Sequence, residues 1–445
     1  MKKIWFLCLL LIPLFLAAQE VPFAVKAKTR YSASGMVGVE KIDSLKFYQA
    51  RLIQEFGFWK IGMGIDLDFL FDEDHYHLRK KDWDHLDDVL DKIYYMRYAK
   101  KGEPLFVHLG GFPGVTMGNG LVMRDYSNMR LYPELRNTGL MIGAQPHWPL
   151  KPSFELFSSN VRKNQIMSLA ARCQPIPDST LKILKDLEVG ISMVVDRNQY
   201  GNLKYVASEA DSIDIDSYDS DPISVWGFAY TLPLIKKEKF TLGQYFELAH
   251  IAHNGTGVIL PGIFAEIKNL KVNLEYRIYG KKFEPAFFDK YYEEERAFQP
   301  VDTLEVFISK EDALQSRKAS HGWNGSINAY LFNRMKAYFA WQNVFGKDLE
   351  NGKSIWLKLW VDTQYKRLES CLLAYSKTNA PRMSIARLNE HNAEIKAEAT
   401  FRVSKRRWYA IAKYQERYKD KNNNGHVNWL KETQRSVGIG VKYVM

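Results

Sequence analysis

Between residues 58 and 71 the chain alternates between large apolar residues and small or charged ones. Successive side chains of a β-strand point to opposite faces, so this pattern predicts a strand with one apolar face and one polar face. At about 3.3 Å per residue the strand would be roughly 40 Å long. That length crosses an apolar layer about 25 Å thick at a tilt of about 40°. The apolar positions are Trp59, Ile61, Met63, Ile65, Leu67, Phe69 and Phe71.

The same alternation recurs along the chain. Clear cases lie near 187–195, 272–279, 335–342, 355–362, 393–403 and 437–445. Roughly 21 candidate strands can be marked from residue 27 onward by this period-two criterion, one of them at 116–125. A soluble β-sandwich also alternates, with its apolar face in the core and its polar face in water. Periodicity alone therefore does not show whether the apolar face contacts lipid or a protein core.

The first residues indicate the compartment. Lys2 and Lys3 are followed by the apolar run 4–16 and then by Ala17 and Ala18. This order predicts a cleaved secretory signal peptide at 1–18, with residues 19–445 forming a single domain. No later segment offers about 18 consecutive apolar residues, as a membrane-spanning helix would need. A mature chain that enters a membrane would do so as a closed barrel, which leaves no strand edge unpaired in lipid.

The composition is compatible with a barrel. Aromatic residues make up 14% of the chain, while its mean hydropathy of -0.32 is that of a soluble protein. A barrel combines both properties, because half of each strand faces lipid, half faces a polar lumen, and aromatic girdles mark the two interfaces. The alternative is a large secreted β protein with an aromatic core. Aromatic residues near strand ends include Trp59, Phe69, Phe71, Trp341, Trp408, Tyr414 and Tyr443.

The connections between candidate strands fall into two kinds. Two short ones are 268–269 and 404–405, whereas long polar ones lie near 72–90, 198–221, 281–320, 378–390 and 418–433. Short periplasmic turns and long extracellular loops are typical of bacterial barrels, which have even strand numbers. We expect an all-β, closed antiparallel transmembrane β-barrel of about 18 strands, with 16 and 20 as neighbouring values. The aromatic and acidic loop 281–320 suits a folded surface loop or a plug.

On these grounds the chain resembles bacterial outer-membrane β-barrel proteins of the porin-like kind, from about residue 27 to its end. The most specific part is the last strand, where Val437, Ile439, Val441 and Tyr443 alternate with small or polar residues. Such proteins usually end in an aromatic residue, and this chain ends in Met445. The resemblance implies an outer-membrane location, pore or transport activity for small solutes, contact with lipid and lipopolysaccharide, and recognition by the barrel-assembly machinery.

One segment is a candidate pore constriction. The Gly-rich stretch 110–120 lacks the Lys-Ser/Thr ending of a phosphate loop, and its simple interpretation is a bend at a barrel rim. Several charged residues follow it. Folded inward, they would set the local field for passing ions. These residues are Arg124, Asp125, Arg130, Glu134 and Arg136.

The polar faces of the predicted strands supply a mixed set of charges. Signal-peptide cleavage would lower the formal net charge from +11 to +9, because it removes Lys2 and Lys3. These positive and negative side chains can either cross-link the lumen through ion pairs or favour the passage of anions. The sequence leaves both interpretations open. The expected lumen-facing residues include Lys60, Asp66, Asp68, Glu275, Arg277, Lys358, Glu394, Lys396, Glu398 and Arg402.

The sequence gives little support for catalysis or metal binding. The chain has no Gly-x-Ser-x-Gly or His-Glu-x-x-His motif, and Cys173 and Cys371 show no zinc spacing. We therefore expect no enzymatic activity, cofactor, metal site or nucleic-acid partner. Three hypotheses remain: a porin-like channel, a barrel with a structural, adhesive or assembly role and no open pore, and a secreted soluble β protein. The oligomeric state is open.

Overall fold

The structure is a computed structural model that describes most of the chain from residue 31 onward. The expected signal peptide at 1–18 lies outside the described residues, as do Glu134 and Arg136. The described residues are 31–42, 45–80, 83, 92–131, 137–176, 183–203, 218, 220–298, 306–332, 334–347, 349, 352–365, 367–381, 390, 392–403, 407–418, 427 and 432–444.

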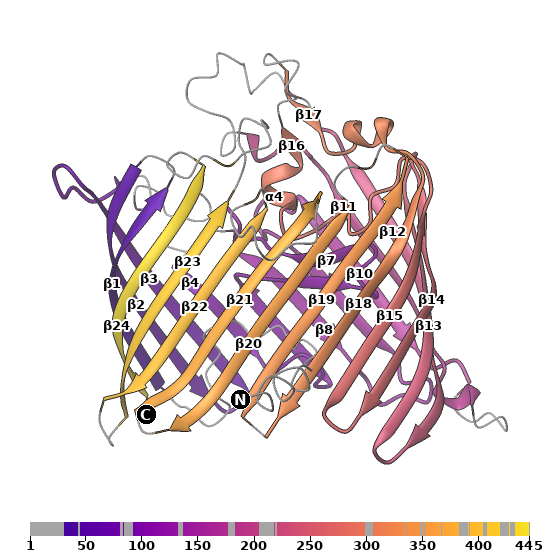
Figure 1. Cartoon of the computed structure of the whole chain (residues 1–445), viewed down its shortest axis with the longest axis horizontal. Helices are drawn as coiled ribbons and strands as arrows, with labels where there is room; N and C mark the ends of the chain where they lie inside the picture. The colour runs from indigo at the N-terminus through magenta and orange to yellow at the C-terminus, as the bar shows by residue number, and fades with distance from the viewer. Residues whose placement is uncertain are drawn as a thin grey trace, which may run out of the picture.

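Twenty strands form one antiparallel sheet that closes on itself, because β1 pairs with both β2 and β24 (Figure 1). Closure satisfies the backbone hydrogen bonds of every wall strand without leaving an edge. The wall consists of β1 (Tyr31–Ile42), β2 (Leu45–Phe58), β3 (Ile61–Asp72), β4 (Ile93–Tyr98), β5 (Leu105–Gly110), β8 (Gly139–Ala144), β9 (Ser153–Ser158), β10 (Ile166–Cys173), β11 (Glu188–Asp196), β12 (Ile223–Lys237), β13 (Phe240–Ile251), β14 (Thr256–Ile267), β15 (Leu270–Tyr279), β18 (Ser320–Leu331), β19 (Met335–Gly346), β20 (Lys353–Tyr365), β21 (Leu368–Ala380), β22 (Ala393–Arg402), β23 (Trp408–Tyr418) and β24 (Thr433–Val444).

The closed all-β barrel predicted from the sequence is confirmed, but the strand number of about 18 is wrong. The wall has 20 strands, four of which (β4, β5, β8 and β9) contain only 6 residues each. Such short stretches are difficult to tell from loops by alternation alone. The candidate strand 116–125 is also wrong as a wall strand: it overlaps β6 (Val115–Met117) and β7 (Met123–Tyr126), which pair with each other in a separate sheet.

The two rims of the barrel differ. Wall strands alternate in direction, so every second connection lies at the same rim, and β24 ends at the lower rim in Figure 1. The lower rim receives tight connections such as 59–60, 238–239 and 268–269, together with the longer 174–187, while the two-residue connection 43–44 lies at the upper rim. The upper rim receives 73–92, 111–138, 197–222, 280–319, 381–392 and 419–432. The segments in which the sequence predicts long loops therefore meet at one end.

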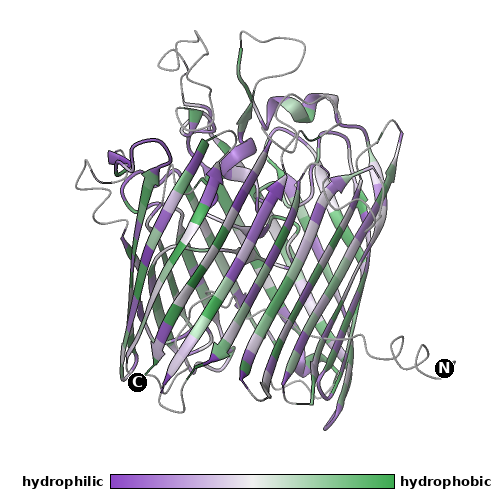
Figure 2. Cartoon of the chain, turned by 60° about the vertical axis from the view of Figure 1, so that its left-hand side comes forward, coloured by the Kyte–Doolittle hydropathy of each residue, from purple (hydrophilic) through white to green (hydrophobic). Residues whose placement is uncertain are grey.

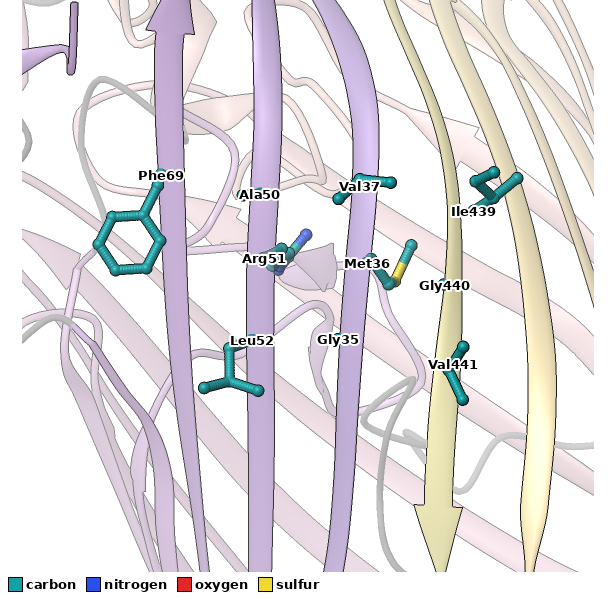
Figure 3. A pocket seen from close by; sticks show the side chains of 10 residues that line it. All are labelled: Gly35, Met36, Val37, Ala50, Arg51, Leu52, Phe69, Ile439, Gly440 and Val441. Carbon is teal, nitrogen blue, oxygen red and sulfur yellow. The ribbon is translucent and has the colours of Figure 1, made fainter.

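The outer face of the wall is apolar. Figure 2 shows hydrophobic and hydrophilic residues alternating along the strands. Ile191, Leu373 and Ile439 are 61%, 54% and 64% exposed, each near the middle of its strand. A shallow depression on the outside of β24, β1, β2 and β3 is likewise lined by side chains such as Val37 and Leu52 (Figure 3). An apolar surface of this extent suits lipid rather than water.

Aromatic pairs occur near both rims. Near the lower rim the ring centroids of Trp408 and Tyr443 are 5.1 Å apart. Near the upper rim Phe69 stacks on Trp83 with centroids 4.6 Å apart. Such rings are favoured at the two interfaces of a membrane. Within the described parts of the chain, no helix has the length and hydrophobicity that a membrane crossing requires.

The apolar outer face makes a depth-dependent prediction. Leu373→Arg would place a cation near the middle of β21, and we expect it to lower the free energy of unfolding by about 2–4 kcal/mol. Ile278→Arg, one residue from the upper end of β15, should cost at most about 1 kcal/mol, because its side chain can reach the interface. Urea unfolding in lipid vesicles measures both values. An equal loss in the free energy of unfolding at the two positions would contradict the assignment of Leu373 to the middle of the membrane and of Ile278 to its interface.

Candidate functional site

The inner face of the barrel consists of two unlike arcs. From β5 to β15 most inward residues are small or apolar and buried, as at Gly143, Ala170, Val194 and Ala249. We call this side the packed arc. From β20 through β24 and on to β3 the inward positions carry many charges, and we call this side the charged arc. Its charged residues include Arg51, Asp66, Asp68, Lys358, Glu394, Lys396, Glu398, Lys413 and Arg417.

The packed arc is covered by residues 111–131, here named loop A, which contains β6 and β7. The chain turns into the lumen at Gly110, whose φ of +128° is a conformation that L side chains rarely adopt. A Cβ at this position would also lie 2.4 Å from the carbonyl oxygen of Tyr94. Loop A buries Val115, Leu121 and Met123 completely against the wall. These contacts make part of the barrel interior an ordinary hydrophobic core.

A second segment, residues 280–298, packs on loop A and is named loop B. It contains α4 (Tyr292–Glu295) and β16 (Ala297–Phe298), which pairs with β17 (Ile308–Ser309). The Ala286 N–H donates to the Leu121 carbonyl at 2.7 Å, and the Arg124 N–H donates to that of Phe288 at 3.1 Å. Loop B thus runs beside β7, where Met123 and Phe288 form a parallel bridge. The aromatic residues that favoured a folded loop or a plug in the sequence pack inside the barrel.

Two wall side chains anchor loop A through three hydrogen bonds. The carboxylate of Glu247, on β13, accepts the backbone N–H groups of Asn119 and Leu121, each at 3.0 Å. Arg172, on β10, donates to the carbonyl of Gly118 at 3.0 Å. Glu247 is completely buried, so these two hydrogen bonds offset much of its loss of water. The tip of loop A is therefore held on the packed arc.

A buried polar cluster ties loop B to the top of the packed arc. Asp196, at the end of β11, accepts the Tyr292 hydroxyl at 2.9 Å and Arg296 Nη1 at 3.3 Å. Arg296 Nη2 also donates to Gln165 at 3.0 Å. In the same region Tyr126 of loop A donates to Glu293 of loop B. Each of these charged groups has a partner, as a buried charge requires.

Both loops also cross to the charged arc, where they meet at Glu394 of β22. Arg130 of loop A lies 2.5 Å from the Glu294 carboxylate of loop B and 3.7 Å from that of Glu394. Lys290 of loop B pairs with Glu394. The Arg130 guanidinium also lies 4.4 Å from the ring centroid of Tyr291, at a distance suited to cation–π attraction. We call Arg130, Lys290, Glu294 and Glu394 the seam.

Electrostatics in the loops reflect this burial. Burial disfavours the charged form of Arg130, but Glu294 and Glu394 outweigh it, so the pKa of Arg130 is raised. Elsewhere in loop B burial raises the pKa of Asp289 to about 7, against the opposing effect of Lys310 at 3.6 Å. Arg130 therefore stays charged over the whole physiological pH range.

Side chains of the charged arc are linked to one another beyond the seam. Arg51 of β2 binds Asp66 of β3 with two hydrogen bonds, at 2.8 and 2.6 Å. Gln49 donates to Asp68 at 2.9 Å and to Glu40 at 3.2 Å. Bidentate pairing of this kind fixes both orientation and charge. The charged arc is thus an ordered polar wall.

The structure describes three of the five constriction candidates and places them in different surroundings. Glu134 and Arg136 lie outside the described residues. Arg124 approaches the Asn324 side chain of β18 at 3.5 Å, and Asp125 is exposed with a φ of +51°. Arg130 alone joins the seam, where it meets Glu394 from the set of expected lumen-facing residues.

The expected lumen-facing residues occupy three environments. Lys60 is not on a strand: it lies in the turn between β2 and β3 and pairs with Glu103 at 2.7 Å. Glu275 and Arg277 face inward on β15, buried and joined by a hydrogen bond at 2.6 Å. The other seven face inward along the charged arc, and they are Asp66, Asp68, Lys358, Glu394, Lys396, Glu398 and Arg402.

The sequence analysis did not single out Glu247, Lys290 or Glu294. A signal for the packed arc was present, because the polar face predicted near 187–195 carries no charge between Glu188 and Asp196, only Gly190, Ser192 and Val194. An inner face without charge implies that something other than water covers it. Among the described residues, no group of three potential metal-ligating side chains could hold a metal ion.

A comparison with solved structures finds several outer-membrane proteins. Wzi of Escherichia coli, an outer-membrane protein involved in group 1 capsule assembly and a carbohydrate-binding β-barrel, is 11% identical with a TM-score of 0.34 and covers 93% of this chain and 84% of its own. OccAB3 of Acinetobacter baumannii is 9% identical, with a TM-score of 0.32 and coverages of 93% and 98%. The siderophore receptor PirA of the same organism is 8% identical, with a TM-score of 0.38 and coverages of 95% and 81%.

This chain has the architecture of a bacterial outer-membrane β-barrel. The closed strand pairing and the apolar outer face define this architecture. No protein-family model matches the sequence, and a search of curated proteins finds no match. Function must therefore be argued from the barrel interior.

The seam yields a prediction about how the loops are held. Glu394→Gln would leave Arg130 and Lys290 beside a neutral amide, and we expect it to lower the free energy of unfolding by about 3–5 kcal/mol, as breaking a buried ion pair does. Hydrogen exchange should increase in loops A and B before it increases in the wall. Glu398→Gln is the matched control: it loses a partly exposed pair with Lys413 at 3.4 Å, worth at most about 1 kcal/mol. Unchanged exchange in the Glu394 variant would show that the seam does not hold the loops.

Proposed function

We propose that this barrel is an outer-membrane channel for small polar or charged solutes, and that solutes pass along the charged arc beside loops A and B. The observation that carries this proposal is the division of the lumen. One side is a packed apolar core, and the other keeps long charged side chains such as Lys396 only partly buried. A barrel of 20 strands is wide enough for an aqueous path unless its interior is filled.

The orientation follows from the rims. We infer that the lower rim, with its tight turns and the end of β24, faces the periplasm, and that the upper rim with its long connections faces outward. Loops A and B enter from the upper rim, so the seam would be the constriction that a solute meets first. Export by the expected signal peptide, insertion by the barrel-assembly machinery and contact with lipopolysaccharide belong to this proposal.

A second candidate is a barrel with no open pore and a structural, adhesive or assembly role. The observation in its favour is that loops A and B reach from Glu247 on β13 to Glu394 on β22 and so bridge the lumen. The apolar outer face disfavours the third hypothesis, a secreted soluble protein. We propose no catalytic activity for any of the clusters described above.

Planar-bilayer conductance of the purified protein tests the channel. We expect stepwise ion conductance from the wild type. Ser436→Trp would place a large ring on the inner face of β24 in the charged arc, and we expect it to reduce the conductance severalfold. Val437→Trp, one residue further along, faces lipid and should leave conductance unchanged. A wild-type protein that folds as a barrel but conducts nothing would favour the closed alternative.

A further inference from the structure

In several ion pairs of the charged arc the cation is more exposed than the carboxylate. At the junction of β2 and β3 the side chain of Arg51 is 22% exposed, whereas its partners Asp66 and Asp68 are 1% and 3% exposed. The side chain of the cation is thus more accessible than that of either anion. A solute beside this wall therefore meets the cation before it meets the anions.

The same order holds around Glu394. Its side chain is 3% exposed, while those of Arg417, Lys290 and Lys396 around it are 20%, 27% and 42% exposed. One deeply buried carboxylate is thus surrounded by cations that keep contact with the lumen. Near the lower end of β22, Arg402 is 43% exposed and its partner Glu369 is 21% exposed.

Further hydrogen bonds keep other carboxylates of this wall inside it. Glu40 accepts the side-chain amides of Gln49 and Gln434 at 3.2 and 3.1 Å, and Glu55 accepts the Ser32 hydroxyl at 2.9 Å. Both glutamates are buried. Carboxylate side chains are shorter than those of Lys and Arg, whose stems carry the charge away from the wall.

Three ion pairs have the opposite order. Glu398 is 29% exposed against 21% for Lys413. In the seam Glu294 is 14% exposed against 6% for Arg130. At the upper end of β21 Lys377 is 1% exposed against 22% for its partner Glu390.

We infer that the passage selects anions, and that its solutes are small organic molecules bearing a carboxylate, phosphate or sulfonate group. This inference rests on the proposed channel. A count of formal charges along the arc is nearly balanced and suggests no preference. The accessibility of the charged side chains decides the ion preference, because a passing ion interacts most strongly with the nearest charges. Charges farther than about 10 Å are screened at 0.1 M salt. Arg51, Arg417, Lys396 and Arg402 carry the selectivity.

The test is the reversal potential across a KCl gradient in planar bilayers, which gives the chloride-to-potassium permeability ratio. We expect a ratio above one for the wild type. The double variant Lys396→Gln/Arg402→Gln should lower it by about twofold or more at 0.1 M salt, where screening reaches about 10 Å. Replacing Lys396 does not leave the buried carboxylate of Glu394 unpaired, because Arg130, Lys290 and Arg417 remain as its partners.

Two variants make the test specific. Lys46→Gln removes one positive charge that pairs with Glu73 on the outer side of the wall, and it should leave the ratio unchanged. Glu398→Gln removes the most accessible carboxylate among these pairs and should raise the ratio. Heat-dependent gel mobility confirms that each variant is a folded barrel.

The outcomes separate the two proposals. A conducting wild type with a ratio at or below one, or a ratio that the double variant leaves unchanged, would overturn anion selectivity and leave the channel intact. Absence of any conductance in the folded wild type would overturn both. A lower permeability ratio in the double variant, together with a higher ratio in Glu398→Gln, would support the exposed cations as the selecting groups.

Discussion

Closure of the sheet is the constraint on which the rest of this structure depends. The pairing of β1 with β24 gives every wall strand two neighbours, so no strand edge has to be satisfied by lipid. Closure also fixes two faces for each strand, because side chains alternate. One face must then be apolar for the membrane, and the other must either be hydrated or be covered by protein. A barrel of 20 strands is too wide for its own wall side chains to fill.

This chain uses both solutions, one on each side of its lumen. On the packed arc the inward residues are small enough for loops A and B to lie against them, and the contact is a conventional hydrophobic core. On the charged arc, long side chains pair with one another and keep the space polar. Glu394 lies where the two regimes meet, since it binds Arg130 and Lys290 from the loops and Arg417 from the wall. Removing its charge would therefore affect the loops and the lumen together.

Sequence reasoning recovered the features that depend on local periodicity. The alternation at 61–72 corresponds to β3, with Asp66 and Asp68 inward and Phe69 outward. It failed at 116–125, where β6 and β7 form a hairpin inside the lumen and the consecutive residues Leu121, Val122 and Met123 are all buried. Lys60 continues the same parity, but a two-residue turn removes it from the inner face. Contacts such as Arg130 with Glu394 join segments far apart in the chain, and period-two patterning contains no information about them. Which charge of a pair is buried is likewise decided by packing in three dimensions.

The central claim is that the lumen is filled on one side and accessible on the other. Its most direct test compares two serines on inward faces, each changed to cysteine in a background lacking Cys173 and Cys371. Ser436 lies on β24 in the charged arc, and Ser192 lies on β11 beneath loop A. We expect a charged, membrane-impermeant methanethiosulfonate reagent to modify Ser436→Cys rapidly and Ser192→Cys hardly at all in the folded barrel. Equal modification of the two cysteines, or faster modification at position 192, would contradict the division of the lumen.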